Sequence, residues 1–400
     1  MPTPRSRRPF VRALTAAVAV GALVFGSALP AHAAPVVSEV AGGELVASLT
    51  EYGGLLYLGS ENGLQSFDGT TFTTIPGAPE SPRDFVEYLG DLWMVGGPVT
   101  NADAAELWRF DGTTLSQYTA DGRDPVVVGG TLYFLSGAVG SELLTRTDGT
   151  TTVVEAGPPT DVKEIALAPT GDVALTVGTA RVLWTFDGTA FTQVVQAGAP
   201  VNVDGLRTLS GVLAFDGQAT AGDDDTAYTW DGTAFSQLGT ADLVGCFVED
   251  AGTLYYVGND GSSRMFSATV SVAASEAPVT PTIPSGCPQF VASDGTLYLR
   301  AQGTGGNPTL HTWDGTTLTE LDSVGDFPTG LVEYGGKIYF SAQATTETPS
   351  LFVLEDVTST PTAPTLPATG AQVSWWLLAV AAVLLAGGAG ILVVRGRRRA

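Results

Sequence analysis

Histidine, cysteine and basic side chains are scarce in this 400-residue chain, which has 2 histidines, 2 cysteines and 18 Lys and Arg against 41 Asp and Glu. Beyond residues 1–33 only His311 remains, so histidine-rich metal sites are excluded, and two cysteines cannot form an all-cysteine zinc site. A Ser-His-Asp or Cys-His arrangement would have His311 as its only base, and no nucleophile motif adjoins it. We expect His311 to be a structural residue on the surface of strand 311–313, and we expect no enzymatic activity.

Basic residues are fewer still in the part of the chain that we expect to be exported. Four arginines lie within residues 1–33 and four within residues 395–400, which leaves ten basic residues against 41 acidic ones. Nucleic acids and anionic lipids are bound by Lys and Arg that replace counterions, so this surface excludes nucleic-acid binding. The acidity either keeps an exported domain soluble or favours cations and neutral polyols.

Both termini read as targeting segments. Residues 1–33 combine four arginines, the apolar run 13–29 and the small-residue site Ala31-His32-Ala33, which predicts a secretory signal peptide. At the other end, residues 375–394 are twenty uncharged residues, enough to cross a hydrocarbon core of about 30 Å, and the basic tail 395–400 would stay cytoplasmic. We therefore predict a secreted chain with a C-terminal transmembrane helix.

A pentapeptide stands before this helix, namely Leu366, Pro367, Ala368, Thr369 and Gly370. Pentapeptide, apolar span and basic tail together resemble the LPxTG sorting signal of Gram-positive surface proteins. The resemblance implies that a sortase cuts after Thr369 and joins it covalently to peptidoglycan, so that the membrane holds the protein only before cleavage. The alternative is a chance match before an ordinary membrane anchor, without sortase cleavage.

The region between the ends, residues 34–356, is built from repeats. Asp-Gly-Thr recurs at intervals of 43, 37, 39, 44 and 83 residues, the last being two units with one triplet missing near Ser267. An eighth unit would run from Phe327 to Asp356. The in-phase triplets begin at Asp68, Asp111, Asp148, Asp187, Asp231 and Asp314.

The residue pattern within each unit predicts four short strands. Segments such as 87–95 read as strand, Gly-marked turn, strand, and 107–118 reads as a hairpin whose Asp111-Gly112 suits a two-residue type I′ turn. Four strands per 41 residues, repeated eight times, predict an all-β fold, a β-propeller of about eight blades. Seven blades or an open array of β-repeats are the alternatives, although a propeller leaves fewer open edges.

One unit supports a named resemblance. Residues 106–113, Glu-Leu-Trp-Arg-Phe-Asp-Gly-Thr, are similar to the ELWxxDGT repeat, and the wider pattern is similar to kelch-like propeller repeats. The resemblance implies a fold and no specific function.

Ring closure and the cysteines give two further predictions. The eighth unit ends after three strands, and Val36 to Val40 are a spare extended piece that we expect to become its outer strand. Cys246 and Cys287 lie 41 residues apart, each just before an inner strand, and we predict a disulfide in the oxidising exterior.

Length varies in one class of loop, 96–105, 216–227, 258–263, 301–309 and 341–350. Function usually lies on variable loops held by a rigid scaffold, so we predict a binding face there. Its most polar residues are Asp223, Asp224, Asp225, Asn259 and Asp260. They would hold calcium or sugar hydroxyls, or are simply solvated, because neither cluster has the spacing of a known calcium loop.

The expected protein is a wall-anchored surface module that binds an unknown ligand, either a glycan or another envelope protein. An extracellular carbohydrate-active enzyme is one alternative, because glycoside hydrolysis needs only two carboxylates, and a structural envelope protein is the other. The Thr/Pro-rich linker 357–365 spans only about 30 Å when extended, which favours a partner close to the wall.

Overall fold

The computed structural model describes residues 36–355, apart from 41–45, 98–104, 156–158, 240, 251, 260–262, 270–276, 279–289, 294, 304–305, 322–325 and 344–348. They lie within one unit of the chain, residues 35–356. The predicted signal peptide, linker, sorting pentapeptide, transmembrane segment and basic tail all lie outside the described residues. Within these residues, no helix is long and apolar enough to span a membrane.

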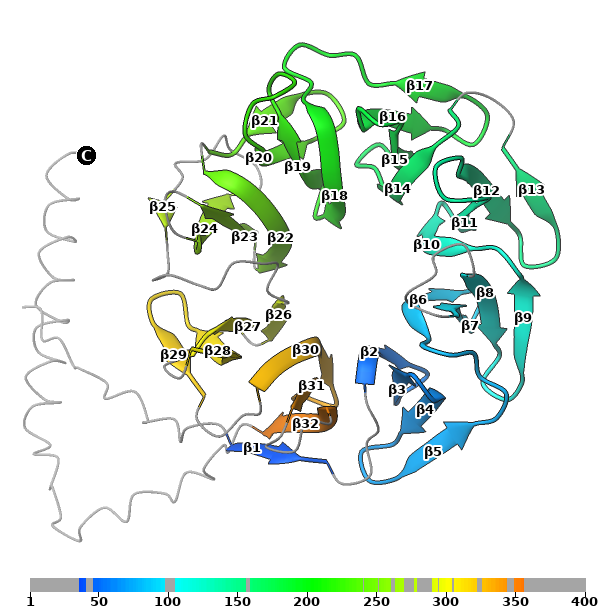
Figure 1. Cartoon of the computed structure of the whole chain (residues 1–400), viewed down its shortest axis with the longest axis vertical. Coiled ribbons are helices and arrows are strands. Elements are labelled where there is room, and N and C mark those ends of the chain that lie inside the picture. Colours follow the sequence, from blue (N-terminus) through cyan, green and yellow to red (C-terminus); the bar gives the residue numbers. More distant parts are fainter. Residues whose placement is uncertain are drawn as a thin grey trace, which may run out of the picture. The chain divides into compact units, whose positions relative to one another are not determined.

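Eight antiparallel four-stranded sheets follow one another around a ring, which confirms the eight-bladed prediction (Figure 1). The first strand of each blade lies nearest the axis of the ring, and the fourth lies at its rim. The first four blades consist of β2 (Val46–Tyr52), β3 (Leu55–Ser60), β4 (Gly63–Phe67) and β5 (Phe72–Ile75); β6 (Arg83–Tyr88), β7 (Asp91–Gly96), β8 (Glu106–Phe110) and β9 (Leu115–Thr119); β10 (Arg123–Val128), β11 (Thr131–Ser136), β12 (Leu143–Thr147) and β13 (Thr152–Val154); β14 (Val162–Leu167), β15 (Val173–Val177), β16 (Val182–Phe186) and β17 (Phe191–Gln193).

Blades 5 to 8 complete the ring. They consist of β18 (Val201–Leu209), β19 (Val212–Gln218), β20 (Thr226–Trp230) and β21 (Phe235–Gln237); β22 (Asp242–Asp250), β23 (Thr253–Asn259), β24 (Ser263–Thr269) and β25 (Ala277–Pro278); β26 (Phe290–Ser293), β27 (Thr296–Gln302), β28 (Pro308–Trp313) and β29 (Leu318–Glu320); β30 (Asp326–Tyr334), β31 (Lys337–Gln343), β32 (Pro349–Glu355) and β1 (Val36–Glu39).

The core lies between the blades. In the described residues, eight apolar clusters each join two neighbouring blades. Tyr57 of blade 1, for example, packs with Leu92, Met94 and Phe110 of blade 2. A second strand such as β7 is buried along its whole length because a neighbouring blade covers each of its faces, so it reads as an apolar run rather than an alternating one.

The N-terminal strand closes the ring, as predicted. β1 pairs with β32 from Val36↔Glu355 to Glu39↔Phe352, so the outer strand of blade 8 comes from the start of the exported chain. Blade 8 also packs against blade 1, and the Tyr334 hydroxyl donates a hydrogen bond to the Gly54 carbonyl across this junction at 3.0 Å. The alternative of an open array of β-repeats is therefore wrong.

The Asp-Gly-Thr hairpins differ from the predicted type I′ turn. Phe110 pairs with Leu115, so the loop has four residues, and Asp111 is absent from the residues with positive φ. The Asp111 Oδ1 instead accepts hydrogen bonds from the Thr113 and Thr114 amides at 2.9 and 2.7 Å and from the Thr113 hydroxyl. Asp-Gly suits both geometries, and the following Thr selects the capped loop because its hydroxyl adds a donor. The other five triplets make the same three contacts.

Two predictions concern details of blade 6. The position of the missing triplet begins at Thr269, two residues after Ser267, because Ala268 pairs with Leu254 as Trp313 pairs with Leu297. Cys246 lies within the inner strand β22 rather than before it. Cys287 lies outside the described residues, so the predicted disulfide stays a prediction.

Candidate functional site

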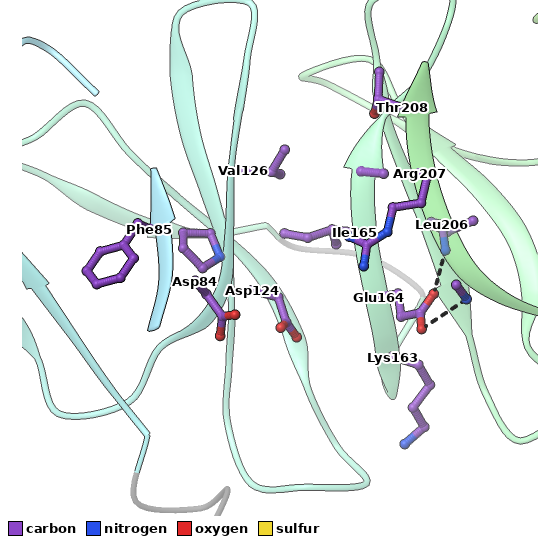
Figure 2. Close-up of a pocket in the computed structure, with 13 residues that line it drawn as sticks. Asp84, Phe85, Asp124, Val126, Lys163, Glu164, Ile165, Leu206, Arg207 and Thr208 are labelled. Carbon is purple, nitrogen blue, oxygen red and sulfur yellow. Dashed lines mark hydrogen bonds between the residues drawn. The ribbon is translucent and has the colours of Figure 1, made fainter. Parts of the chain in front are cut away.

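A cavity of about 660 Å³ lies between the inner strands of four consecutive blades, β6, β10, β14 and β18. Figure 2 shows side chains from all four strands around one space, with the Asp84 and Asp124 carboxylates side by side. Its volume is in the range of small-molecule sites, about 300–1,000 Å³. The described residues of the variable loops contribute none of the lining, so this cavity is distinct from the predicted binding face.

A recurring bulge brings the two carboxylates into the cavity. The pairing of β6 with β7 slips between Arg83 and Val86, and that of β10 with β11 slips between Arg123 and Val126. Asp84 and Asp124 follow the last pair before the slip, with φ of 51° and 50°. A left-handed backbone next to an inner-strand bulge re-aims the side chain.

Three other blades have the same bulge with a different residue. The left-handed position is Gly205 in blade 5 and Gly330 in blade 8, both with φ of 65°, and Cys246 in blade 6 with φ of 59°. Glycine adopts positive φ without steric cost, whereas a Cβ adds a cost that is smallest for aspartate and asparagine. Blades 2 and 3 therefore retain aspartate where the backbone favours glycine.

Each of these aspartates follows an arginine that fixes the bulge. Arg83 Nη1 donates to the carbonyls of Ser81 and Gly97 at 3.2 and 3.0 Å, and Arg123 Nη2 donates to the Gly137 carbonyl, the equivalent position in blade 3. Both arginines thus join the start of the inner strand to the end of the second. This Arg-Asp pair, repeated 40 residues apart, is the signal by which sequence analysis could have found the site.

The pKa of Asp124 is raised to about 6. Partial burial between the inner strands is the largest cause, although Asp124 still has an exposed surface in the cavity; the Asp84 carboxylate and Glu142 raise the pKa as well, and Arg123 and Arg83 lower it. A carboxyl group with this pKa is mostly ionised at pH 7 and gains a proton within the mildly acidic range.

The pKa of Asp84 is shifted in the same direction. Burial raises its pKa, and Arg83 and Arg207 oppose the rise. The Arg83 Nε lies 3.8 Å from the Asp84 carboxylate, and 48% of the Asp84 side chain is exposed, so water in the cavity reaches it. The Asp84 carboxylate in turn contributes to the raised pKa of Asp124.

The remaining charges of the cavity divide into groups with a protein partner and groups exposed to solvent. Lys163 forms ion pairs with Asp161 and, at 3.6 Å, with Glu142. The Glu164 carboxylate accepts the Gly205 and Leu206 amides at 3.2 and 3.1 Å, the two contacts drawn in Figure 2. Among the described residues, the Asp124 carboxylate and the Arg207 guanidinium make no hydrogen bond or ion pair.

The residues predicted for the binding face lie elsewhere. Asp223 accepts hydrogen bonds from the amide and hydroxyl of Thr220, at 2.9 and 2.6 Å, within its own loop between β19 and β20. Asp224 is exposed beside it, and Asp225 helps to raise the pKa of Asp216 to about 7, for which burial is the main cause. Asn259 ends β23, and Asp260 lies outside the described residues.

Calcium binding stays a prediction. Within the part of the chain that the structure describes, no three His, Cys, Asp or Glu side chains come together as a metal site.

His311 is not on the surface. It lies in the middle of β28 with 5% of the residue exposed, and its Nδ1 lies 3.2 Å from the Thr309 carbonyl. Burial lowers its pKa. The third strand of a blade is covered on both faces by neighbouring blades, which the His-Thr-Trp segment alone did not reveal.

Comparison with known proteins gives one family match and several similar folds. The model of the LPXTG cell wall anchor motif matches residues 358–400. No curated protein matches the chain.

Three solved structures illustrate the similar folds. A streptogramin B lyase is 11% identical with a TM-score of 0.43, over 80% of this chain and 98% of that one. A puromycin-hydrolysing peptidase of Mycobacterium tuberculosis is 13% identical with a TM-score of 0.49, over 68% of this chain and 50% of that one. The propeller domain of the Trilobed protease from Pyrococcus furiosus is 12% identical with a TM-score of 0.44, over 73% of this chain and 99% of that one. At these identities the likeness concerns the fold alone.

The anchor motif implies processing by a sortase and covalent attachment to the wall. Together with the closed ring of eight blades, it defines the chain as a cell-wall-anchored surface protein that carries an eight-bladed β-propeller domain.

Proposed function

We propose that the propeller is a binding module and that a small polar ligand enters the cavity between blades 2 and 5. The observation that carries this proposal is the pair Asp84 and Asp124, held with positive φ and aimed into one cavity at positions where other blades have glycine. Bulges that re-aim a side chain are over-represented next to functional sites. Neither carboxylate is needed to make the bulge, since Gly205 and Gly330 make it as well.

The anchor limits the ligand's source. A linker of nine residues between the propeller and the sorting pentapeptide keeps the end of blade 8 within about 30 Å of that pentapeptide. A soluble fragment of the wall or another diffusible small molecule reaches the cavity more easily than a second cell does.

Binding is tested with the purified exported region, residues 34–365, because the ring closes within residues 36–355. Soluble peptidoglycan fragments and a glycan array are titrated with and without calcium, and each ligand found is titrated again with Asp124→Gly. We expect saturable binding that this substitution weakens. Binding unaffected by Asp124→Gly would place the ligand site outside the cavity.

A carbohydrate-active enzyme is the second candidate. The pKa of Asp124, about 6, suits a general acid, and Asp84 provides the second carboxylate that glycoside hydrolysis requires. Assaying the same ligands for cleavage separates the two candidates, because a binding module returns its ligand intact. Product formation that Asp124→Asn abolishes would establish the enzyme, whereas neither binding nor cleavage would favour a structural role in the envelope.

A further inference from the structure

The cavity has two walls of opposite charge. Asp84 and Asp124 come from β6 and β10, whereas Arg207 comes from β18, three blades away from β6. Figure 2 shows the two carboxylates on one side of the space and the Arg207 guanidinium extending from the other. Arg207 lowers the pKa of Asp84, so the two walls act on each other across the opening without forming an ion pair.

Among the described residues that line the cavity, Asp124 and Arg207 have no charged partner in contact, and Asp84 has only the 3.8 Å ion pair with Arg83. Lys163 is occupied by Asp161 and Glu142, and Glu164 by two backbone amides of β18. A simple cation would satisfy the aspartates and leave Arg207 facing it, and a simple anion would meet two carboxylates. A neutral sugar would use neither the carboxylates nor the guanidinium as a charged partner. A ligand with an ammonium group at one end and a carboxylate at the other satisfies both walls at once.

We infer that the cavity binds a zwitterion, a free amino acid or a short peptide with charged ends, with its ammonium group between Asp84 and Asp124 and its carboxylate on Arg207. This inference rests on the proposed binding function and adds the class of ligand. A bidentate guanidinium–carboxylate contact would fix the orientation, since Arg presents two parallel donors to a carboxylate. A volume of about 660 Å³ has room for a small peptide rather than a folded segment.

The inference also gives the site a pH dependence. The charged groups that act on Asp124 are Asp84, Arg83, Arg123 and Glu142, and Asp124 keeps a pKa of about 6 among them. An ammonium group is held by the ionised carboxylate, which falls to about a tenth of molecules one pH unit below the pKa. Affinity for the zwitterion should therefore fall up to about tenfold between pH 7 and pH 5.

The test is calorimetric titration of the exported region with alanylalanine, its N-acetyl form, its C-terminal amide, and N-acetylglucosamine as the neutral probe. We expect the free dipeptide to bind and each blocked form to bind at least about tenfold more weakly, as expected for the loss of one charged contact. Arg207→Gln should bind the free dipeptide and its amide equally, and Asp124→Asn should lose the preference for a free amine.

The outcomes separate this inference from the proposed function. If a glycan binds in a manner sensitive to Asp124→Gly, and alanylalanine neither binds nor competes, the cavity is a binding site but the zwitterion is wrong. If blocked and free dipeptides bind equally, the charge assignment is likewise wrong. If neither the dipeptides nor the glycans bind, both the inference and the proposed function fall. Circular dichroism of each variant shows whether it is folded.

Discussion

The same bulge carries aspartate in blades 2 and 3 and glycine in blades 5 and 8. The backbone is alike in all four blades, with φ from 50° to 65° at the left-handed position and the same slip in pairing with the second strand. Because glycine suffices in two blades, the fold does not need the carboxylates in the other two. The comparison separates what builds the ring from what the cavity presents to a ligand.

The largest expected effect concerns the closure of the ring by β1, which holds the blades and their bulges in place. Deleting residues 34–41 removes β1, exposes the edge of β32 and should lower the melting temperature by about 10 °C or more. The point substitutions Val37→Asp and Ser38→Asp separate side-chain packing from backbone pairing, since Val37 packs on the core of blade 8 and Ser38 is exposed. Calorimetry should show a large decrease in melting temperature for Val37→Asp and a small decrease for Ser38→Asp. Equal losses would mean that β1 contributes backbone pairing alone.

A second prediction reverses the comparison by placing aspartate where glycine stands. A Cβ at Gly205 would lie 2.8 Å from the Asp216 Oδ1, whereas a Cβ at Gly330 would meet only Leu49, at 3.6 Å. Gly205→Asp adds a close contact and a like charge to the left-handed strain, so it should reduce the free energy of unfolding by about 2–4 kcal/mol. Gly330→Asp is the matched control and should cost about 1 kcal/mol. Urea unfolding measures the free energy of unfolding of both variants. Similar decreases would show that the backbone angle alone, and not the contact with Asp216, sets the cost of the substitution.

Much of this fold follows from the repeat. The sequence predicts both the eight blades and the closure by Val36 to Val40, of which Val36 to Glu39 form β1, because a repeat period and a missing strand can be read from residue spacing. The turn at Asp111 was mistaken, because Asp-Gly favours two geometries and only the hydrogen bonds of Thr113 distinguish them. His311 was placed on the surface because burial between blades depends on chain segments that its own sequence does not contain.

The cavity could be predicted less well than the ring. Loop length drew attention to Asp223 and Asn259, whereas the cavity lining comes from inner strands of regular length. A bulge moves a side chain to another face without changing the sequence pattern, so alternation could not assign Asp84 and Asp124 to the cavity. Only their shared arginine neighbour marks them in the sequence.

The third prediction removes the difference between the blades. Asp124→Gly should weaken ligand binding about 10–100-fold, the usual range for one charge-assisted contact, and leave stability nearly unchanged. Relief of the left-handed strain and of repulsion from Asp84 offsets the greater freedom of glycine in the unfolded chain. The matched control is Asp148→Gly, which removes a turn cap and should lower the melting temperature with binding intact. Loss of stability in Asp124→Gly would assign the carboxylate a structural role.

The smallest effect is a difference of sign in how two aspartates respond to acid. The pKa of Asp124 is raised to about 6, mainly by burial, and that of Asp148 is lowered to about 2, mainly by hydrogen bonds from Thr151 and Thr150. An unfolded aspartate titrates near 3.9, so between pH 6 and 4 the native state holds the Asp124 proton more tightly, and stability contributed there rises as pH falls. The Asp148 contribution is complete above about pH 4 and is lost as pH falls toward 2. The free energy of unfolding is measured for the wild type and for Asp124→Asn at pH 7 and at pH 5. Between pH 7 and pH 5 it should rise more in the wild type than in Asp124→Asn. An equal change in both proteins would mean that water in the channel keeps the pKa of Asp124 near its ordinary value, and the pH dependence inferred for ligand binding would disappear with it.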